Sequence, residues 1–183
     1  PLPKAEKVKK RVDGEEIEVD VTYERGIVWT DYDSKKTWYE PCAYEMEDEY
    51  SGANVIPSKP SYIISHDGRL YISGSVDDND NVFISDIQSP FYFPATLPMQ
   101  LPSNADKIVG LTVFDSCVII GRRYDIYSIR GTTNRLDAGM ELFTLKKLNT
   151  HTGFANDDCF DLVHNYLFFL GHDGVAYALS AGR

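Results

Sequence analysis

The sequence DKIVGLTVFDSCVIIGRRYDIYSIRG, residues 106–131, decides the fold class. Its apolar runs IVGLTVF, CVIIG and IYSI are rich in β-branched and aromatic residues, and short polar steps separate them. Such residues favour strands, and no run is long enough to form one apolar helical stripe. This stretch therefore predicts consecutive short strands joined by tight turns.

The same order of apolar runs and turns recurs on both sides of this stretch. An apolar strand ends at equivalent positions spaced by 43, 47 and 50 residues: Asp31, Gly74, Gly121 and Gly171. Self-similarity over about 40 to 50 residues, built from short strands, is typical of propeller blades. The sequence therefore predicts an all-β, propeller-like fold of about four blade-like units. A β-sandwich with evenly spaced strands is the alternative.

We expect a single domain over residues 1–183, because 43% of the residues are hydrophobic and no internal segment has the composition of a linker. In KVKKRVDGEEIEVDVTY, an Asp-Gly step separates a basic limb from a limb of alternating apolar residues, which predicts an N-terminal hairpin within residues 1–24. The blade-like units follow it, and the first matches the repeat least well: 25–60, 61–105, 106–153 and 154–183.

Composition argues against several classes of partner. The formal net charge is -10, whereas nucleic acids and anionic membrane surfaces attract concentrated positive charge. No apolar run approaches the roughly 20 residues of a membrane-spanning helix. The cysteines are odd in number and lack Cys-x-x-Cys spacing, which favours reduced thiols over disulfides or zinc: Cys42, Cys117 and Cys159. We expect a soluble chain assembled in the cytoplasm, with no nucleic acid bound and no membrane insertion.

The triplet His-Asp-Gly occurs twice, at residues 66–68 and 172–174. The first copy precedes the strand that ends at Gly74, whereas the second follows the equivalent Gly171, so the two occupy different turns of the repeat. Asp-Gly between strands is a strong hairpin signal. The triplets therefore indicate turns rather than a repeated active site.

The loop VDDNDNV contains the candidate metal site. Asp77, Asn79 and Asn81 alternate as in the first half of a calcium-binding loop, where short oxygen-bearing side chains converge on one ion. The glycine that normally follows is replaced by Val82, and no bidentate Glu stands at the expected distance, so a solvated turn is the favoured interpretation. We expect no cofactor unless this loop binds calcium.

Catalytic signals are weak. An acidic run could supply a carboxylate pair, although four acids on one loop are more typical of a solvated segment: Glu45, Glu47, Asp48 and Glu49. The chain has no Gly-x-Ser-x-Gly elbow, and its histidines mostly lie in or beside predicted turns: His66, His151, His164 and His172. We therefore expect that the protein is not an enzyme.

An aromatic connector, SPFYFPATLP, follows a predicted strand. Phe91, Tyr92 and Phe93 stand between prolines and carry a large apolar surface. They either fill the space between neighbouring blades or form an exposed patch for a partner subunit, and packing is favoured because so apolar a loop is a liability when exposed.

Several short motifs resemble, in their order and spacing, the β-propeller of bacteriophage tail structural proteins of the tail-nozzle and tail-stabilisation type. A Ser-Asp step leads into a proline and aromatic connector, an Asp-x-Ile-x-Gly-Leu strand entry and an Ile-Tyr-x-Ile-x-Gly strand follow, and a Thr-Gly step precedes a closing Phe-Leu-x-x-Asp-Gly-Val pair. The matching residues are Ser85, Asp86, Pro90, Phe93, Pro94; Asp106, Ile108, Gly110, Leu111; Ile126, Tyr127, Ile129, Gly131; Thr152, Gly153; Phe169, Leu170, Asp173, Gly174 and Val175.

The resemblance covers about residues 61–179, and the acidic first third does not match in detail. It implies a structural virion protein of a phage or prophage tail, which contributes to tail assembly by docking onto other tail proteins and copies of itself. Such propellers belong to longer chains with more blades, so a fragment of a larger propeller is one interpretation of this sequence.

Two other classes of function remain open. A binding module would recognise a host-surface glycan or protein, with Trp29, Trp38 or Tyr44 as stacking faces. A propeller hydrolase would use acids that line a central pore, and the acidic run at residues 45–49 is the segment that would supply them.

Overall fold

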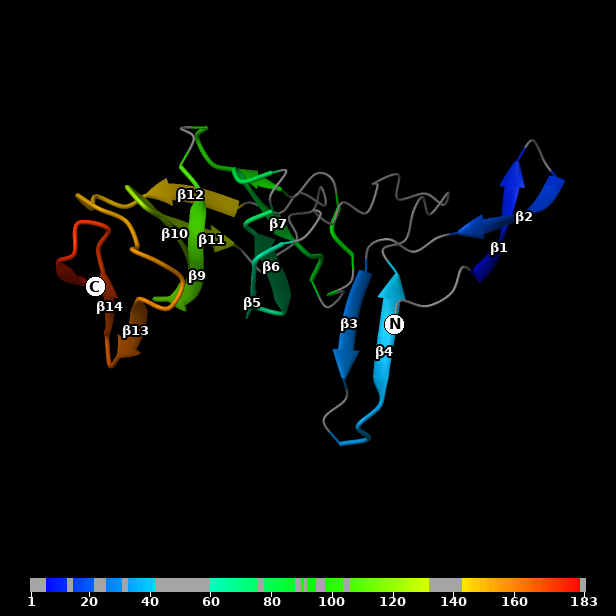
Figure 1. Ribbon diagram of the computed structural model, residues 1–183, viewed down its shortest axis with the longest axis horizontal. Coiled ribbons are helices and arrows are strands. Elements are labelled where there is room, and N and C mark those ends of the chain that lie inside the picture. Colours follow the sequence, from blue (N-terminus) through cyan, green and yellow to red (C-terminus); the bar gives the residue numbers. More distant parts are fainter. Residues whose placement is uncertain are drawn as a thin grey trace.

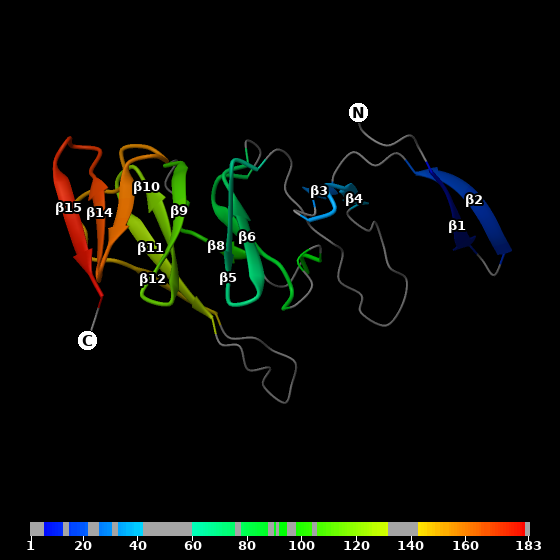
Figure 2. The same ribbon diagram turned by 90° about the horizontal axis from the view of Figure 1, so that it is seen from below.

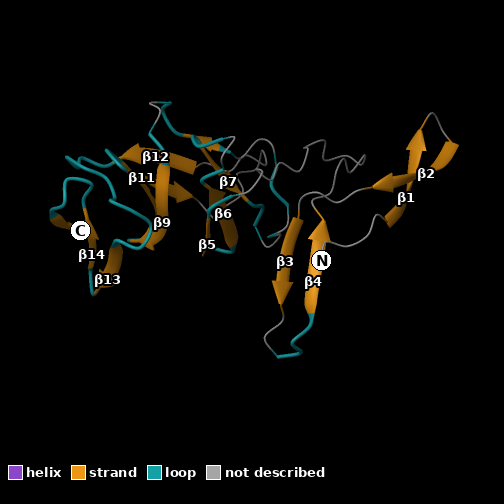
Figure 3. Ribbon diagram, viewed as in Figure 1, coloured by secondary structure: helices purple, strands orange, loops and turns teal. Residues whose placement is uncertain are grey.

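The computed structural model describes residues 6–12, 15–21, 26–30, 33–41, 60–75, 78–87, 90, 92–94, 98–103, 106–131 and 143–181, with side chains before residue 60 only at 30 and 33–36. All regular secondary structure in these residues is β, with fifteen strands and no helix (Figure 3). The all-β prediction is therefore confirmed for the described residues, and each of their strand pairs is antiparallel. In this described part, no helix has the length and apolarity to span a membrane.

Three sheets form the larger part of the structure, and in each of them strands that follow one another in sequence are hydrogen-bonded neighbours. The first has four strands: β5 (Tyr62–His66), β6 (Arg69–Ser73), β7 (Asn81–Ile84) and β8 (Met99–Gln100). The second has four: β9 (Ile108–Phe114), β10 (Cys117–Arg122), β11 (Ile126–Gly131) and β12 (Phe143–Lys147). The third has three: β13 (Phe160–Val163), β14 (Tyr166–Leu170) and β15 (Ala176–Ser180).

Two further hairpins precede these sheets. One joins β1 (Glu6–Val12) to β2 (Glu15–Val21), and the other joins β3 (Gly26–Thr30) to β4 (Thr37–Pro41). The predicted N-terminal hairpin is confirmed, and its register sets basic residues of β1 opposite acidic residues of β2, as in Lys9↔Glu18. Opposite charges at directly paired positions stabilise an antiparallel pair.

The three larger sheets stack face to face in a row (Figures 1 and 2). Strand β10 explains why the middle sheet is covered on both faces, since successive side chains of a strand point to opposite sides. Val118 and Ile120 belong to the apolar cluster shared with β5–β8, whereas Cys117 and Ile119 belong to the cluster shared with β13–β15. The continuous apolar run of residues 117–120 is thus buried on both sides, which distinguishes this stack from a two-sheet sandwich.

The described strands form no closed or propeller-like sheet. The reason is geometric: a ring closes when the last sheet meets the first, and here β9–β12 separates β5–β8 from β13–β15 (Figure 2). The predicted repeat nevertheless corresponds to successive strand groups, because β5–β8 fall within residues 61–105, β9–β12 within 106–153 and β13–β15 within 154–183.

The Asp-Gly step of each His-Asp-Gly triplet lies in a connection between two strands. Asp67 and Gly68 adopt φ of 47° and 72° between β5 and β6, the paired positive values of a tight hairpin turn. Gly174 has a φ of 81° in the connection that leads from β14 into β15. Asp115 and Ser116, with φ of 51° and 56°, make a similar turn without glycine between β9 and β10.

Candidate docking surface

The outward face of the β13–β15 sheet is exposed and largely apolar, with Asp161 and Ser180 as its polar residues. In β14, Leu167 and Phe169 point toward β9–β12 and are buried, whereas the alternate residues Tyr166, Phe168 and Leu170 are 42–48% exposed. The side chains at positions i, i+2 and i+4 of a strand lie on one face, so these three residues form a stripe.

The neighbouring strands extend this stripe into a surface. Phe168 is paired with Ala178 on one side and with Asp161 on the other, and Tyr166 is paired with exposed Val163. The rings of Tyr166 and Phe168 lie 6.0 Å apart. Small alanines on β15 leave the aromatic rings uncovered, and we call this apolar surface the outer face: Val163, Tyr166, Phe168, Leu170, Ala176 and Ala178.

A hydrogen bond fixes the connection at one end of this sheet. The Tyr177 hydroxyl donates to Asp173 Oδ2 at 2.6 Å, and the Val175 amide donates to Asp173 Oδ1 at 3.1 Å. The hydrogen bond from Tyr177 lowers the pKa of Asp173 and raises the pKa of Tyr177. The same hydrogen bond holds the Asp173 side chain in place. The β14–β15 connection is therefore held in one conformation while Ala176 and Leu170, which follow and precede it, remain on the outer face.

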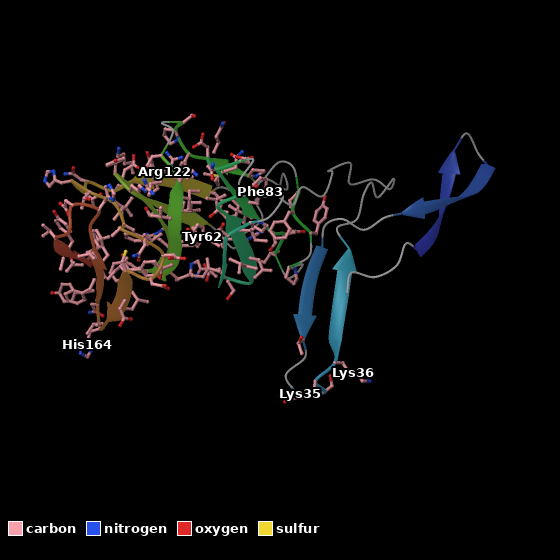
Figure 4. The ribbon with its side chains drawn as sticks, viewed as in Figure 1. Lys35, Lys36, Tyr62, Phe83, Arg122 and His164 are labelled. Atoms are coloured by element: carbon pink, nitrogen blue, oxygen red, sulfur yellow. The ribbon has the colours of Figure 1, made fainter. Side chains whose placement is uncertain are left out.

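Behind the outer face, a buried arginine links two sheets of the stack. The Arg122 side chain is fully buried and donates from Nη2 to Asp80 Oδ1 at 2.8 Å and from Nη1 to the Pro102 carbonyl oxygen at 2.7 Å. Its guanidinium carbon also lies 5.7 Å from the centre of the Tyr127 ring. Charge-assisted hydrogen bonds of this kind are strong and directional, so Arg122 connects the end of β10 to the loop before β7 and to the segment after β8. Figure 4 shows Arg122 with Tyr62 and Phe83 within the stacked part of the molecule.

The backbone beside Arg122 is joined to the third sheet. The Phe154 amide donates to the Arg122 carbonyl oxygen at 2.7 Å, and the Gly153 amide donates to the Arg123 carbonyl oxygen at 2.9 Å. A side chain at residue 153 would overlap the Arg122 carbonyl group, so glycine permits this close approach. The turn at residues 122–125 is therefore hydrogen-bonded to segments beside both neighbouring sheets, which connects the sheet that carries the outer face to the rest of the stack.

A second ion pair borders the same turn. Lys147 Nζ lies 3.1 Å from Asp125 Oδ2, and the Tyr127 hydroxyl donates to the same oxygen at 3.2 Å. Burial, and then the Asp125 carboxylate, raise the pKa of Tyr127, while the hydrogen bond to Asp125 raises the pKa of Lys147. Tyr127 and Lys147 belong to β11 and β12, and Asp125 lies in the turn between β10 and β11, so these contacts hold the turn against its own sheet.

The candidate calcium loop is only partly described, because Asp77 lies outside the described residues. Asn79 and Asn81 are half-buried, and the side-chain Nδ2 of Asn81 donates to Asp78 Oδ2 at 2.8 Å. Asp80, which the sequence motif skips, is directed at Arg122. Among the described residues, no group of three His, Cys, Asp or Glu side chains is placed to hold a metal ion.

The aromatic connector is only partly described, and its described residues differ in burial. Phe91 lies outside the described residues, and Tyr92 is half-buried. Phe93 is 1% exposed and belongs to a cluster with Ile72 and Phe83, on the face of β5–β8 that points away from β9–β12. Phe93 therefore packs against its own sheet, and its ring is inaccessible to a partner.

We expect Phe93→Leu to lower the free energy of unfolding by about 1–2 kcal/mol, because a smaller side chain leaves part of the space against Ile72 and Phe83 unfilled. Urea denaturation of the two proteins measures this change. Tyr92→Leu is the matched control at the half-buried neighbour and is expected to have a smaller effect. An equal or smaller loss for Phe93→Leu would contradict the assigned packing role.

The other candidate residues are not brought together. Trp29 and Trp38 are paired across the β3–β4 hairpin, but their side chains, the acids Glu45, Glu47, Asp48 and Glu49, and Tyr44 lie outside the described residues. Three of the histidines, His151, His164 and His172, lie in separate turns and loops. His66 lies at the end of β5, and its Nε2 is 3.4 Å from Asp67 Oδ2. His164 stands in the β13–β14 turn and Lys35 and Lys36 in the β3–β4 turn (Figure 4).

Of the outer-face residues, only Leu170 was named from sequence, as part of the closing motif, and none was predicted to form a docking surface, although a signal for one exists. Residues 166–170, YLFFL, are apolar at every position. An uninterrupted apolar strand indicates burial on both faces, whereas the described residues cover only one. The mismatch between that pattern and the observed exposure is what marks the surface.

Comparison with known proteins adds no relative to these observations. No protein-family model matches the chain, and a search of the curated proteins finds none that is significantly similar. The function proposed for the chain therefore has to come from its residues and their packing.

Proposed function

We propose that this chain is a structural protein of a phage or prophage tail, in which stacked four-stranded sheets form part of a propeller and the outer face docks onto another tail protein. The observation that carries the proposal is the outer face itself. Monomeric proteins rarely expose large contiguous apolar patches, and such patches often mark interaction surfaces. The proposal involves no reaction, no cofactor and no nucleic acid.

The residues that resemble tail propellers support this proposal by where they lie. Ser85 is fully buried and its Oγ accepts a hydrogen bond from the Leu70 amide at 2.8 Å, and Asp106 Oδ2 accepts one from the Tyr124 amide at 3.0 Å. Gly153 makes the close approach to Arg122. Motif residues thus hold strands and connections in place, which is the role expected of a scaffold rather than of a catalytic site.

The stack supports the propeller part of the proposal. Propeller blades are four-stranded antiparallel sheets packed face to face, and β5–β8 and β9–β12 have that strand number and order. A stiff stack suits a spacer in an assembly, because loops of variable length can differ while the sheets keep their positions.

The test is to label intact particles of the source phage, or of its induced prophage, with an antibody against this chain and to locate the label by electron microscopy. The proposal predicts label at a fixed position on the tail. Unlabelled particles, with the protein expressed and its epitopes accessible after disruption, would overturn it and leave the binding-module alternative in first place.

The docking role is tested separately by Tyr166→Ser combined with Phe168→Ser. Both side chains are half exposed on the outer face, so we expect little loss of stability but loss of incorporation into particles, measured by quantitative immunoblotting of purified virions. Ile63→Ser is the matched control, because Ile63 is 61% exposed on β5, away from the outer face. Normal incorporation of the double variant would exclude the outer face as the docking surface.

A further inference from the structure

The two His-Asp-Gly triplets differ in how their aspartates are held. A backbone amide that follows an aspartate can attack the side-chain carboxyl carbon of that aspartate, and glycine hinders this attack least because it has no Cβ. Asp67-Gly68 lies between β5 and β6, and Asp173-Gly174 lies between β14 and β15. The third Asp-Gly step, at residues 13–14, lies outside the described residues.

In the second triplet, hydrogen bonds occupy both reacting groups. The Asp173 carboxylate accepts from the Tyr177 hydroxyl at 2.6 Å and from the Val175 amide at 3.1 Å. The Gly174 amide donates to the Gly171 carbonyl oxygen at 2.9 Å. The hydrogen bond from Tyr177 also lowers the pKa of Asp173, which favours the ionised carboxylate, a poor target for attack. Attack of Gly174 on Asp173 therefore disrupts several contacts at once.

In the first triplet, both reacting groups are accessible. The Asp67 side chain is 50% exposed, and among the described residues its carboxylate is paired only with His66, whose Nε2 lies 3.4 Å from Oδ2. No described residue accepts a hydrogen bond from the Gly68 amide, as expected for a central residue of a two-residue hairpin turn. A Cβ added at Gly68 would meet only Ile87 Cγ1, at 3.8 Å, and one added at Gly174 would meet no atom within 4 Å. Space is thus available at both glycines, and the hydrogen bonds distinguish the two steps.

The position of the first turn also favours local opening. In the described part of its sheet, β5 has β6 as its single neighbour, and His66↔Arg69 is the last pair before the turn. Turns at the ends of strand pairs open at a much lower free energy than the core of a sheet. Opening allows Asp67 to leave its left-handed φ of 47° and to bring its carboxyl group beside the Gly68 amide.

We propose that Asp67-Gly68 is a site of spontaneous isoaspartate formation, with His66 as the proton donor, and that Asp173-Gly174 is protected from the same reaction. The Gly68 nitrogen forms a bond to Asp67 Cγ and gives up its proton. One carboxylate oxygen leaves as water, with that proton and a second one from the His66 imidazolium, and a succinimide ring results.

Water then opens the ring, so the water lost on closure is regained. Attack of water at Cγ of Asp67 restores aspartate, whereas attack at its backbone carbonyl carbon leaves the main chain running through Cγ. His66 regains its proton from solvent, and no other reactant is consumed. The inference concerns the purified chain and does not depend on the tail assignment, so each can fail without the other.

Isomerisation at this position changes the first sheet. It lengthens the main chain by one methylene group in a two-residue turn, and turn length sets the register of a hairpin. The first pair after the turn is His66↔Arg69, and the Arg69 side chain is buried and donates to the Ser85 carbonyl oxygen at 2.7 Å. The modification therefore acts on a buried contact as well as on the surface.

The experiment incubates the full chain at neutral pH and quantifies isoaspartate at each site by mass spectrometry with electron-transfer fragmentation, after digestion in mild acid. In the folded protein, isoaspartate is expected to form about tenfold faster or more at residue 67 than at residue 173, because the loss of one hydrogen bond to a charged group is enough for a tenfold change in rate. In urea the two rates should become similar. An equal or faster rate at residue 173 in the folded protein would overturn the proposal, as would the absence of product at residue 67 while the unfolded chain forms it.

Two variants separate the roles of the hydrogen bonds and of His66. Tyr177→Phe removes the hydroxyl that binds Asp173 and keeps the ring that stacks on Phe169, so it should speed isomerisation at Asp173 and leave Asp67 unchanged. His66→Gln removes the proton donor and should slow the reaction at Asp67 severalfold, with no change at Asp173. An unchanged rate at Asp173 in the first variant would contradict the protection, and an unchanged or faster rate at Asp67 in the second would contradict the role of His66.

Discussion

Replacing Arg122 with methionine should lower the free energy of unfolding by about 2–4 kcal/mol. Removing one partner of a buried ion pair typically costs about 3–5 kcal/mol, because the remaining group keeps its desolvation penalty. The Asp80 side chain is 26% exposed and can regain water, so the lower part of that range applies. The Pro102 carbonyl also loses its charged donor, and urea denaturation monitored by fluorescence measures the combined effect.

Arg123 provides the matched control, because it is the next residue along the chain and is exposed. Arg123→Met is expected to change stability by no more than about 0.5 kcal/mol, as for most surface substitutions. Arg122→Lys should recover only part of the loss, because an ammonium group cannot reproduce the planar fork that reaches two acceptors. Equal stabilities for Arg122→Met and Arg123→Met would show that the Arg122 contacts contribute nothing to the stack.

Arg122 also illustrates what sequence alone could not reveal. The strand positions of residues 106–131 follow from local alternation and turn chemistry, and the structure has strands there. The partners of Arg122 are 20 and 42 residues away along the chain, and no local pattern indicates that Asp80 and Pro102 meet it. Long-range polar contacts of this kind depend on how the sheets stack, which the sequence pattern leaves open.

Phe93 and the outer face also differ in how far the sequence alone could predict them. The sequence located Phe93 in an apolar connector and favoured packing, because that inference needs only composition. The outer face depends on which side of β14 remains uncovered, and an apolar strand looks the same whether a neighbour is present or absent.

Phe154 should be the most sensitive position between the second and third sheets. Its side chain is fully buried, and its ring centroid lies 5.0 Å from that of Phe160 and 5.2 Å from that of Phe169. Phe154→Ala is expected to lower the free energy of unfolding by about 3–5 kcal/mol, because it leaves a cavity between packed sheets. Phe168→Ala removes the same side chain from the exposed outer face and should cost less than about 1 kcal/mol.

A double-mutant cycle with Gly121 identifies the cause of this sensitivity. A Cβ added at Gly121 would overlap the Phe154 ring, so Gly121→Ala alone should cost about 1–3 kcal/mol through overpacking. In the presence of Phe154→Ala the new methyl group enters the vacated space, and the two losses should fall short of additivity by about 1 kcal/mol or more. Additive losses in urea denaturation would mean that Gly121 and Phe154 do not share one packing site, and the contact between β10 and the third sheet would then need another explanation.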